Sequence, residues 1–253
     1  MNHSFHDLIA NGKPAFGMYV GDCGAAVCEM ALLAGFDFLR IDSEHAMNSP
    51  SELRMLIRMA DAFAVPSIVR VTSAEEATRV LDYGADAVLI PDVETGKQAA
   101  EVVKCSKYAT LGSRGMTSFA RCQNYGLTPL TQYHGEANRR ICTAIQIESV
   151  YALDHLDEIL SVEGLDIVAT GPLDLSQSMG TAAQTGTKEM QEAEELVIRK
   201  TLERGLYPLI TASSLQKSAR LSEQGVLLQT ICYDSAFISA KLRDLVGSYR
   251  NGV

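Results

Sequence analysis

The sequence contains no cluster of basic residues. It has 22 lysines and arginines against 31 aspartates and glutamates, which gives a formal net charge of −9 over 253 residues. Binding to the phosphates of a nucleic acid requires concentrated lysine and arginine, which this chain lacks. We therefore expect no nucleic-acid partner. A small acidic substrate is still compatible with this charge, because it needs only one local cationic pocket.

Signals for membrane insertion and export are also missing. No stretch approaches the roughly 18 consecutive apolar residues that span a bilayer, and the first residues lack the charged and apolar regions of a signal peptide. No C-x-x-C pair occurs, which argues against a thiolate zinc site and a disulfide framework. The cysteines are scattered, at Cys23, Cys28, Cys105, Cys122, Cys142 and Cys232. These features predict a cytoplasmic protein with reduced thiols and no membrane partner.

Two nucleotide-binding signatures are absent as well, the G-x-G-x-x-G fingerprint of a dinucleotide-binding sheet and the Walker A loop. The composition that is present, with 47% hydrophobic and 21% charged residues, is that of a folded globular protein. A chain of 253 residues allows one large domain or two small ones.

Short β-branched runs alternate with longer amphipathic runs along most of the chain. The predicted strands cover residues 16–20, 36–41, 67–71, 86–90, 141–147, 166–170, 207–211 and 226–231. Each run is almost continuously apolar, which is typical of parallel strands buried on both faces. Between them, residues 50–62, 73–82 and 188–204 have helical periodicity. Ser49 or Ser51 is expected to cap the first of these helices, and Ser73 with Glu76 forms a capping-box sequence at the start of the second.

A glycine junction repeats at the points where helices lead into strands. Gly35, Gly84 and Gly164 each end a helical pattern, and an aspartate and a strand follow two residues later. Glycine is the usual left-handed cap at the end of a helix, so the repeat suggests one recurring βα unit. Eight strands with this unit favour a TIM (β/α)8 barrel, in one domain over residues 1–253, over an open doubly wound sheet. Residues 108–140 break the rhythm, and we expect either a functional loop that starts at the catalytic face or a surface excursion.

In such a barrel the active site is built where the strands end. The polar residues at predicted strand ends are Asp42, His45, Arg70, Gln146, Glu148 and Asp174. Two carboxylates from neighbouring strands, without cysteine beside them, suit Mg²⁺ or Mn²⁺. The alternative is that each carboxylate only caps the helix that follows it. The coincidence of both with an arginine and a histidine favours a site.

The other residues of this group suggest proton transfer and charge stabilisation. His45 follows a strand end with Asp42 and Glu44 nearby, and a carboxylate partner would orient its imidazole for proton transfer. Arg70 supplies a fixed positive charge for an oxyanion or enolate. The turn that starts at Gly171 leads into a helix whose free N–H groups can bind a carboxylate. No predicted strand end carries a lysine, which disfavours Schiff-base chemistry.

Five segments occur in a familiar order, and together they are more specific than any one of them. They read FDFLRIDSEH, PSIVRV, LGSRG, IQIES and GPLDLS. In this order they resemble the HpcH/HpaI aldolase family of class II pyruvate-dependent aldolases, over about residues 8–246. The resemblance implies a phosphoenolpyruvate/pyruvate-type barrel that reversibly cleaves a 4-hydroxy-2-oxo acid, such as 4-hydroxy-2-oxoheptanedioate, to pyruvate and an aldehyde. It also implies a role in aromatic compound catabolism.

The resemblance implies roles for individual positions. Glu148 and Asp174 match metal-binding carboxylates, for Mg²⁺ or Mn²⁺ with Co²⁺ or Zn²⁺ as further candidates, and Gln146 matches a polar residue beside the metal. The amides of Leu173 and Asp174 would hold the pyruvate carboxylate. Similar proteins are hexamers that exchange C-terminal helices, so residues 234–249 are expected to pack on a neighbouring subunit.

The same resemblance assigns the proton-transfer groups. His45 matches the proposed base, Arg70 the arginine that stabilises the enolate, and Asp42 an acidic residue of the same strand end. Asp82 matches an aspartate that supports the histidine.

Departures from the family pattern affect the aldehyde side of the pocket. Leu173 stands where the family usually has a small residue, residues 108–111 replace a proline-containing stretch, and the aromatic larger than tyrosine that is common near Tyr19 is missing. The acceptor aldehyde therefore stays open. Two other functions stay open as well, a citrate-lyase-like lyase acting on an acyl-CoA and a barrel subunit without catalytic activity.

Overall fold

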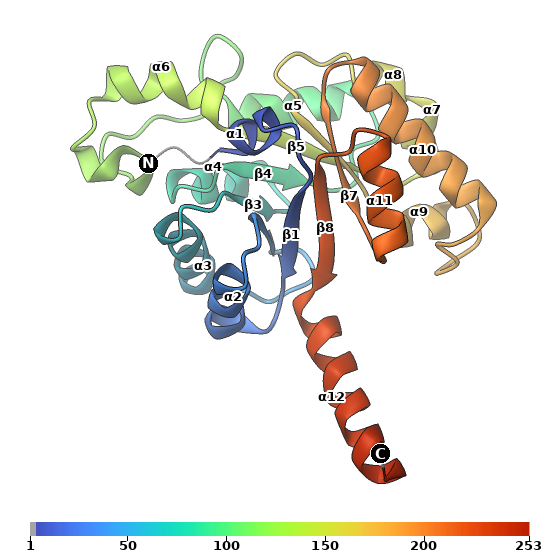
Figure 1. The fold of residues 1–253 in the computed structure, drawn as a ribbon. Helices are drawn as coiled ribbons and strands as arrows, with labels where there is room; N and C mark the ends of the chain where they lie inside the picture. Colours follow the sequence, from blue (N-terminus) through green and yellow to red (C-terminus); the bar gives the residue numbers. More distant parts are fainter. Residues whose placement is uncertain (1–3, 253) are drawn as a thin grey trace.

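The computed structural model describes residues 4–252 and shows eight parallel strands in a closed barrel, each hydrogen-bonded to the next and β8 to β1 (Figure 1). The strands are β1 (Ala15–Val20), β2 (Phe38–Asp42), β3 (Ser67–Arg70), β4 (Ala87–Ile90), β5 (Cys142–Ile147), β6 (Ile167–Thr170), β7 (Tyr207–Thr211) and β8 (Leu228–Tyr233). All eight overlap the predicted runs. The predicted TIM barrel is confirmed.

Helices surround the barrel and connect successive strands (Figure 1). They are α1 (Phe5–Ala10), α2 (Gly24–Leu33), α3 (Pro50–Ala62), α4 (Ala74–Asp82), α5 (Gly96–Ser106), η1 (Arg121–Gly126, a 3₁₀ helix), α6 (Leu130–Arg140), α7 (Val150–Asp154), α8 (Leu156–Ile159), α9 (Pro172–Ser178), α10 (Lys188–Glu203), α11 (Leu215–Glu223) and α12 (Asp234–Asn251). The helices predicted at 50–62, 73–82 and 188–204 correspond to α3, α4 and α10.

The three glycine junctions have the predicted backbone conformation. Gly35, Gly84 and Gly164 have φ values of 94°, 96° and 87°, in the left-handed region that favours glycine. In each case the chain turns back from a helix into the next strand within a few residues. The repeated βα unit read from the sequence is therefore a real feature of the chain.

The predicted capping box at the start of α4 is only half formed. The Ser73 side chain accepts the Glu76 N–H at 3.1 Å, as predicted. The Glu76 carboxylate does not return to Ser73; it accepts the Thr72 N–H at 3.3 Å and the hydroxyl of Ser43. Glu76 thereby ties the start of α4 to the loop after β2. Complete boxes lie on α1, between Ser4 and Asp7, and on α3, where Ser49 and Glu52 bond each other's backbone N–H groups.

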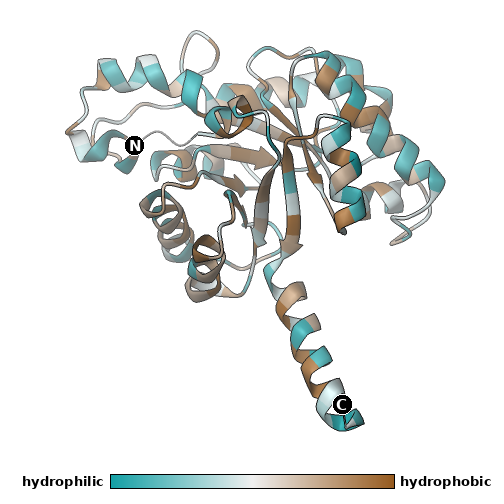
Figure 2. Ribbon diagram, in the orientation of Figure 1, coloured by the Kyte–Doolittle hydropathy of each residue, from teal (hydrophilic) through white to brown (hydrophobic). Residues whose placement is uncertain are grey.

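Apolar side chains fill the half of the barrel at the amino ends of the strands. Alternate residues of each strand point inward, and the strands are mostly hydrophobic (Figure 2). The interior cluster includes Phe38, Ile68, Leu89, Ala144, Ile167, Leu209 and Leu228, all fully buried. At Gly17 a Cβ would lie only 2.1 Å from the Phe38 ring, so glycine leaves the space that this ring occupies. Phe5 of α1 packs edge-on against Phe38, with ring centroids 5.6 Å apart, and closes the amino end of the barrel.

The segment from 108 to 140 differs from its prediction. It is not an aperiodic loop throughout, because it contains η1 and α6. Its buried residues in α6 are only Tyr133 and Ala137, too few to give a clear period in the sequence. It also does not start at the catalytic face, because α5 intervenes and returns the chain to the amino ends of the strands. There Lys107 binds Asp166, just before β6, at 2.9 Å and the carbonyl of Asn138 at 3.1 Å.

A buried carboxylate at the same end of the barrel makes the stability depend on pH. Asp86 precedes β4, accepts the Ser67 N–H at 3.1 Å and pairs with Arg140 at 3.1 Å. Burial raises its pKa to about 6 despite the arginine. The folded state therefore holds this proton more tightly than the unfolded state, and its stability falls as the pH rises from about 4 to 6. The expected loss is on the order of 2 kcal/mol.

This prediction is tested with Asp86→Asn, which keeps an oxygen for the Ser67 N–H and removes the titration. Urea unfolding of the wild type and the variant at pH 4.5 and pH 7 should show that the wild type loses stability relative to Asp86→Asn at the higher pH. Glu203→Gln is the control, because Glu203 is an exposed carboxylate that also pairs with an arginine, Arg199. A difference between wild type and Asp86→Asn that is equal at both pH values would contradict the prediction.

Candidate active site

Arg70 is held by two carboxylates at the carboxyl ends of β2 and β3. Its Nε and Nη2 bind the two oxygens of Asp42 at 2.9 and 2.7 Å, and its Nη1 lies 2.9 Å from Glu44. Burial raises the pKa of Asp42, but the hydrogen bonds and charge of Arg70 outweigh it and leave that pKa below its usual value. The pairing fixes the guanidinium in one orientation, as a bidentate arginine requires. It is thus a permanent cation at the barrel mouth.

Aromatic rings support this arginine. The Tyr19 ring centroid lies 5.2 Å from Cζ of Arg70 and 4.5 Å from Cζ of Arg40. Tyr233 stacks on Tyr19 with ring centroids 4.8 Å apart. Tyr19 lies near the end of β1, and Tyr233 is the last residue of β8. The apolar faces exclude water from beneath Arg70 while they tolerate its charge.

Glu148 is held from three sides. Its Oε2 accepts the side-chain N–H of Gln146, and its Oε1 accepts the backbone N–H of Asp92 at 2.6 Å. Asp92 has a left-handed backbone (φ 54°), a conformation that aspartate tolerates and that turns its N–H toward the carboxylate. On the third side, a Cβ at Gly171 would lie 2.1 Å from Oε2. Glycine is therefore required where β6 meets Glu148.

A cavity of about 500 Å³ opens beside Glu148 at the barrel mouth. Its lining residues are Glu44, His45, Asp92, Glu148, Asp174, Gln177 and Ser178. Burial, with smaller contributions from the charges of Asp174 and Glu44, raises the pKa of Glu148 above its usual value although two hydrogen bonds oppose the shift. The site therefore has an excess of negative charge on this side and a fixed cation, Arg70, beside it. A larger hollow, of about 930 Å³, lies along α10 beside Gln224, the residue after α11, and contains no strand-end residue.

The carboxylates suit a hard cation without forming a complete cage. Among residues 4–252, no three His, Cys, Asp or Glu side chains are close enough to hold a metal ion together. Glu148 and Asp174 nevertheless face one cavity, and both offer oxygen ligands. Mg²⁺ and Mn²⁺ commonly bind one or two protein carboxylates and complete their coordination with water and substrate oxygens. The donor set fits such an ion.

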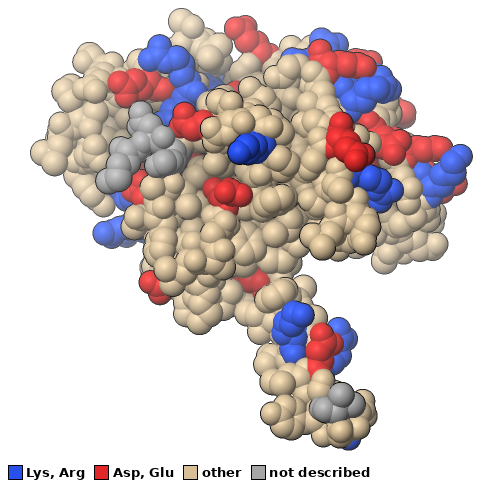
Figure 3. All heavy atoms as spheres, viewed as in Figure 1, with Lys and Arg blue, Asp and Glu red and all other residues tan. Residues whose placement is uncertain are grey.

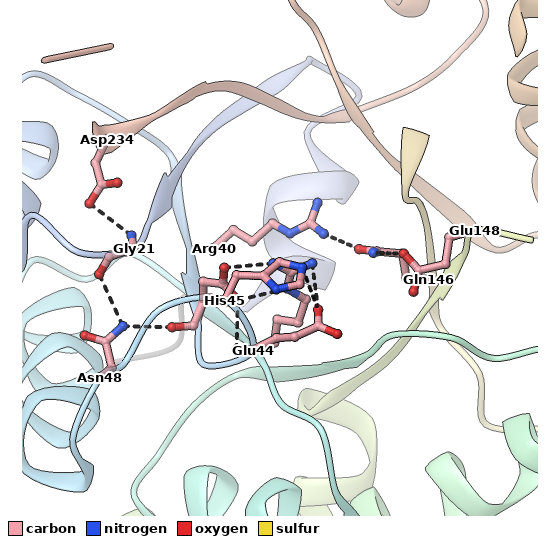
Figure 4. Close-up of polar contacts among 10 residues, drawn as sticks. Gly21, Arg40, Glu44, His45, Asn48, Gln146, Glu148 and Asp234 are labelled. Atoms are coloured by element: carbon pink, nitrogen blue, oxygen red, sulfur yellow. Dashed lines mark hydrogen bonds and ion pairs between the residues drawn. The ribbon is translucent and has the colours of Figure 1, made fainter. Parts of the chain in front are cut away.

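His45 lies at this cavity with its side chain 65% exposed. Its Nε2 is 3.7 Å from Oε2 of Glu44, whereas both oxygens of Asp42 bind Arg70. Glu44, and not Asp42, is therefore the carboxylate that faces the imidazole. Asn48 braces the loop, because its side chain donates to the carbonyls of Gly21 at 3.2 Å and Asp42 at 2.8 Å (Figure 4).

Among the described residues of this one chain, Asp82 does not contact His45, and its expected support of the histidine stays a prediction. Asp82 ends α4, and the helix after a barrel strand runs back toward the amino ends of the strands. Its carboxylate binds Arg114 at 2.6 Å. Arg114 belongs to the LGSRG segment, which therefore lies near Asp82 and not at the mouth.

The first turn of α9 places Leu173 and Asp174 directly after β6. Gly171 precedes the helix and makes no side-chain cap, so the first N–H groups of the turn have no capping side chain. The Leu173 side chain is 62% exposed. Its predicted contact with a substrate carboxylate stays a prediction.

The sequence did not single out Asp92 and Arg40, and it indicated Glu44 only as a neighbour of His45. Asp92 follows β4, and the rule that located the other strand-end residues applies to it too. Glu44 stands within the DSEH segment, but its pairing with Arg70 depends on the loop conformation. Arg40 is a charged residue inside an otherwise apolar strand, and that anomaly was the available signal.

Comparison with known proteins decides the family. The family model for HpcH/HpaI aldolase/citrate lyase matches residues 15–238. The chain belongs to this family. The 2-keto-3-deoxy-L-rhamnonate aldolase of Escherichia coli K12 is 31% identical over 255 residues, which cover all of this chain and 95% of the relative. The expectation of an enzyme, a carbon–carbon lyase of this family, is confirmed.

Solved structures of the family have the same fold. An HpcH/HpaI aldolase from Desulfitobacterium hafniense DCB-2 superposes with a TM-score of 0.92 at 26% identity and covers 98% of this chain and 96% of its own. Citrate synthase SbnG superposes with a TM-score of 0.90 at 28% identity and covers 98% of both chains. The same barrel thus occurs in an aldolase of the family and in a citrate synthase. In residues 4–252, no helix is long and apolar enough to cross a membrane.

Proposed function

We propose that this enzyme is a divalent-metal-dependent aldolase that reversibly cleaves a 4-hydroxy-2-oxo acid to pyruvate and an aldehyde. The proposal rests on one observation: a fixed cation and two carboxylates lie close together at the carboxyl end of the barrel. Arg70 is a fixed cation, and Glu148 and Asp174 face the adjoining cavity. The Escherichia coli relative supports the substrate class, since its name denotes a 2-oxo acid substrate. The compound expected from the sequence, 4-hydroxy-2-oxoheptanedioate, is one member of this substrate class.

Glu148 and Asp174 would hold the metal, with Mg²⁺ or Mn²⁺ as the preferred ions and Co²⁺ or Zn²⁺ as alternatives. Bound there, a divalent cation supplies Lewis acidity toward the 2-oxo group of the substrate. The excess negative charge described above is the condition under which a cation binds most favourably. The lining residues include no lysine, which supports this chemistry over a Schiff base.

Other residues of the site stabilise the developing charge, transfer the proton and orient the substrate. The Arg70 guanidinium stabilises the negative charge that develops on the 2-oxo oxygen as the C3–C4 bond breaks. The His45 imidazole accepts the proton of the C4 hydroxyl, directly or through one water, and returns it in the condensation direction. Backbone N–H groups of Leu173 and Asp174 orient the substrate carboxylate. The exposure of His45 and Leu173 leaves room for the aldehyde half of the substrate on the solvent side.

The direct test is a cleavage and condensation assay with pyruvate and a panel of aldehydes. Pyruvate should form from a 4-hydroxy-2-oxo acid only when a divalent cation such as Mg²⁺ or Mn²⁺ is present, and EDTA should abolish the reaction. Acidic and neutral aldehydes should both be included, because the exposed Leu173 side chain borders the acceptor side. Full activity in EDTA, or no condensation with any aldehyde, would refute the proposal.

Arg70→Ala should slow two reactions together. Cleavage and hydrogen exchange at the pyruvate methyl group pass through the same enolate, and loss of one stabilising group costs about 10²–10³ in rate. NMR in D₂O measures the exchange without an aldehyde. Arg70→Lys keeps a charge beside buried Asp42 but lacks the planar group that bonds both Asp42 oxygens, so an intermediate rate is expected. Normal methyl exchange in Arg70→Ala would remove the arginine from the enolate step.

A second candidate is a lyase or synthase that uses an acyl-CoA, favoured by the similarity to citrate synthase SbnG. The phosphates of coenzyme A would need a basic surface, and on the face shown in Figure 3 acidic and basic side chains are interspersed. Release of free thiol from acetyl-CoA in the presence of a 2-oxo acid distinguishes the two functions. The aldolase proposal expects none.

We also propose that the enzyme is a hexamer in which α12 packs on a neighbouring subunit. Asp234 anchors the start of α12, because its Oδ2 accepts the N–H groups of Gly21 at 3.0 Å and Cys23 at 3.1 Å. Beyond it the helix extends away from the barrel (Figure 1). Its exposed apolar residues are Phe237, Leu242, Leu245, Val246 and Tyr249. An isolated helix of this kind gains stability only when its apolar side is covered.

The double variant Leu242→Asp, Leu245→Asp should therefore form an oligomer with fewer subunits than the wild-type hexamer. Sedimentation velocity of the wild type and the variant measures it. Lys241→Asp, a charge change on the same helix, is the control and should leave the assembly intact. A hexamer in the double variant, or a wild-type monomer, would contradict the proposed packing of α12.

A further inference from the structure

Arg40 is a guanidinium buried inside the barrel. It lies between Phe38 and Asp42 on the inward face of β2 and is 2% exposed. No carboxylate among residues 4–252 forms an ion pair with it, whereas Arg70 has two such partners. Burial lowers the pKa of Arg40 accordingly. Burying an unpaired cation is costly, so a position of this kind needs a reason beyond packing.

Its polar contact leads to Glu148. The Nη2 of Arg40 donates to Oε1 of Gln146, and the Nε2 of Gln146 donates to Oε2 of Glu148. Figure 4 shows the three side chains in one row from β2 to the end of β5. The ring of Tyr19 covers the guanidinium at 4.5 Å, which restricts its movement. The row therefore connects a buried cation to the carboxylate at the cavity.

The donor and acceptor groups of the three side chains allow the hydrogen bonds of the row to run in only one direction, from Arg40 to Glu148. An arginine can only donate, so the oxygen of the Gln146 amide must face Arg40. The NH₂ group then faces Glu148, where a carboxylate can only accept. A flipped amide would place NH₂ against the guanidinium and oxygen against the carboxylate, which is repulsive at both ends. Arg40 thus determines which edge of Gln146 meets Glu148.

We infer that Arg40 is a positioning residue that fixes the Glu148 carboxylate for the divalent cation, through the Arg40–Gln146–Glu148 hydrogen-bond row. The inference rests on the proposed function, because it concerns the metal of that site. Residues behind a metal ligand typically change the affinity about 10- to 100-fold when they are removed. The row holds one Glu148 oxygen from the barrel interior, while the Asp92 N–H holds the other from the loop side.

The test is the Mn²⁺ dissociation constant, measured by EPR or calorimetry in the absence of substrate. Arg40→Met keeps an unbranched apolar stem and should weaken Mn²⁺ binding about tenfold or more. Arg40→Lys still donates to the Gln146 oxygen and should restore most of the affinity. Thr230→Val is the matched control, because Thr230 is a buried barrel residue whose hydroxyl has no partner and which lies outside the row. Thermal unfolding of each variant records any loss of fold separately.

A double-variant cycle separates positioning from charge. If Arg40 acts through the amide, Gln146→Leu alone should weaken Mn²⁺ binding as much as Arg40→Met, and the double variant should be no weaker than either. Additive effects would mean that Arg40 acts through its charge and would overturn the inference. An unchanged dissociation constant in Arg40→Met would overturn it as well. Should Arg40→Met fail to fold, Gln146→Leu breaks the same row and should by itself weaken Mn²⁺ binding about tenfold or more, and an unchanged dissociation constant in that variant would overturn the inference. Absence of Mn²⁺ binding in the wild type would instead refute the proposed function.

Discussion

Glu148→Ala and Asp174→Ala are each expected to abolish metal binding and aldol cleavage while the barrel stays folded. Both side chains face the cavity at the mouth, outside the apolar layers that fill the barrel, so their removal creates no core cavity. The carboxylates supply the only charged oxygen ligands that we assign to the metal. Calorimetry with Mn²⁺ measures the binding, and circular dichroism measures the fold.

Gln177→Ala is the matched control for this pair, because Gln177 lines the same cavity without a carboxylate. It should retain Mn²⁺ binding within a small factor of the wild type. Glu148→Gln adds a sharper comparison, since it keeps the shape of the side chain but removes its charge. Unchanged Mn²⁺ affinity in both alanine variants would show that the metal, if any, is held elsewhere.

The barrel could be predicted from the sequence because its strands and junctions are locally encoded. Each strand is a short apolar run, and Gly35, Gly84 and Gly164 supply the left-handed turns that lead into three of them. The region around α6 was not predictable in this way. Its helix contains Gly135 and buries only Tyr133 and Ala137, so no apolar stripe is visible. Its fixed position depends instead on distant contacts, such as that of Lys107 with Asp166.

The candidate site was predictable only in part, for a similar reason. The strand-end rule locates Asp42, Arg70 and Glu148, because it follows from topology alone. It does not say which groups pair. Arg70 takes both oxygens of Asp42, which leaves Glu44 as the carboxylate beside His45. Such choices depend on side-chain geometry across strands that are far apart in sequence.

A functional residue in the interior of a strand is harder to predict from the sequence than one at a strand end. Arg40 lies two residues before Asp42, where the strand-end rule does not apply and where the apolar pattern of β2 predicts a packing residue. Only the closed barrel shows that this position faces Gln146 of β5. Asp82 is a different case, since the resemblance implies that it supports His45, while the direction of α4 places it at the amino end of its own barrel.

His45→Ala is expected to separate cleavage from enolate formation. If the imidazole carries the C4 hydroxyl proton, cleavage should fall by about 10²–10⁴, the usual contribution of a positioned base. Hydrogen exchange at the pyruvate methyl group involves no C4 hydroxyl, so it should fall far less. Mn²⁺ and pyruvate should still bind, because neither Glu148 nor Asp174 contacts the imidazole through a hydrogen bond or ion pair among the described residues. Steady-state kinetics and NMR exchange measure the two rates on the same preparation.

The contrast between the two rates distinguishes a base from a structural histidine. His155→Ala is the control, because His155 stacks on Tyr151 in the α7 region and should leave both rates unchanged. Glu44→Gln tests the partner, since it removes the carboxylate beside the imidazole and also one contact of Arg70. It should therefore slow cleavage and exchange together, unlike His45→Ala. Near-normal cleavage in His45→Ala, with an unchanged dependence of the rate on pH, would exclude the imidazole as the base and leave that role to a metal-activated water.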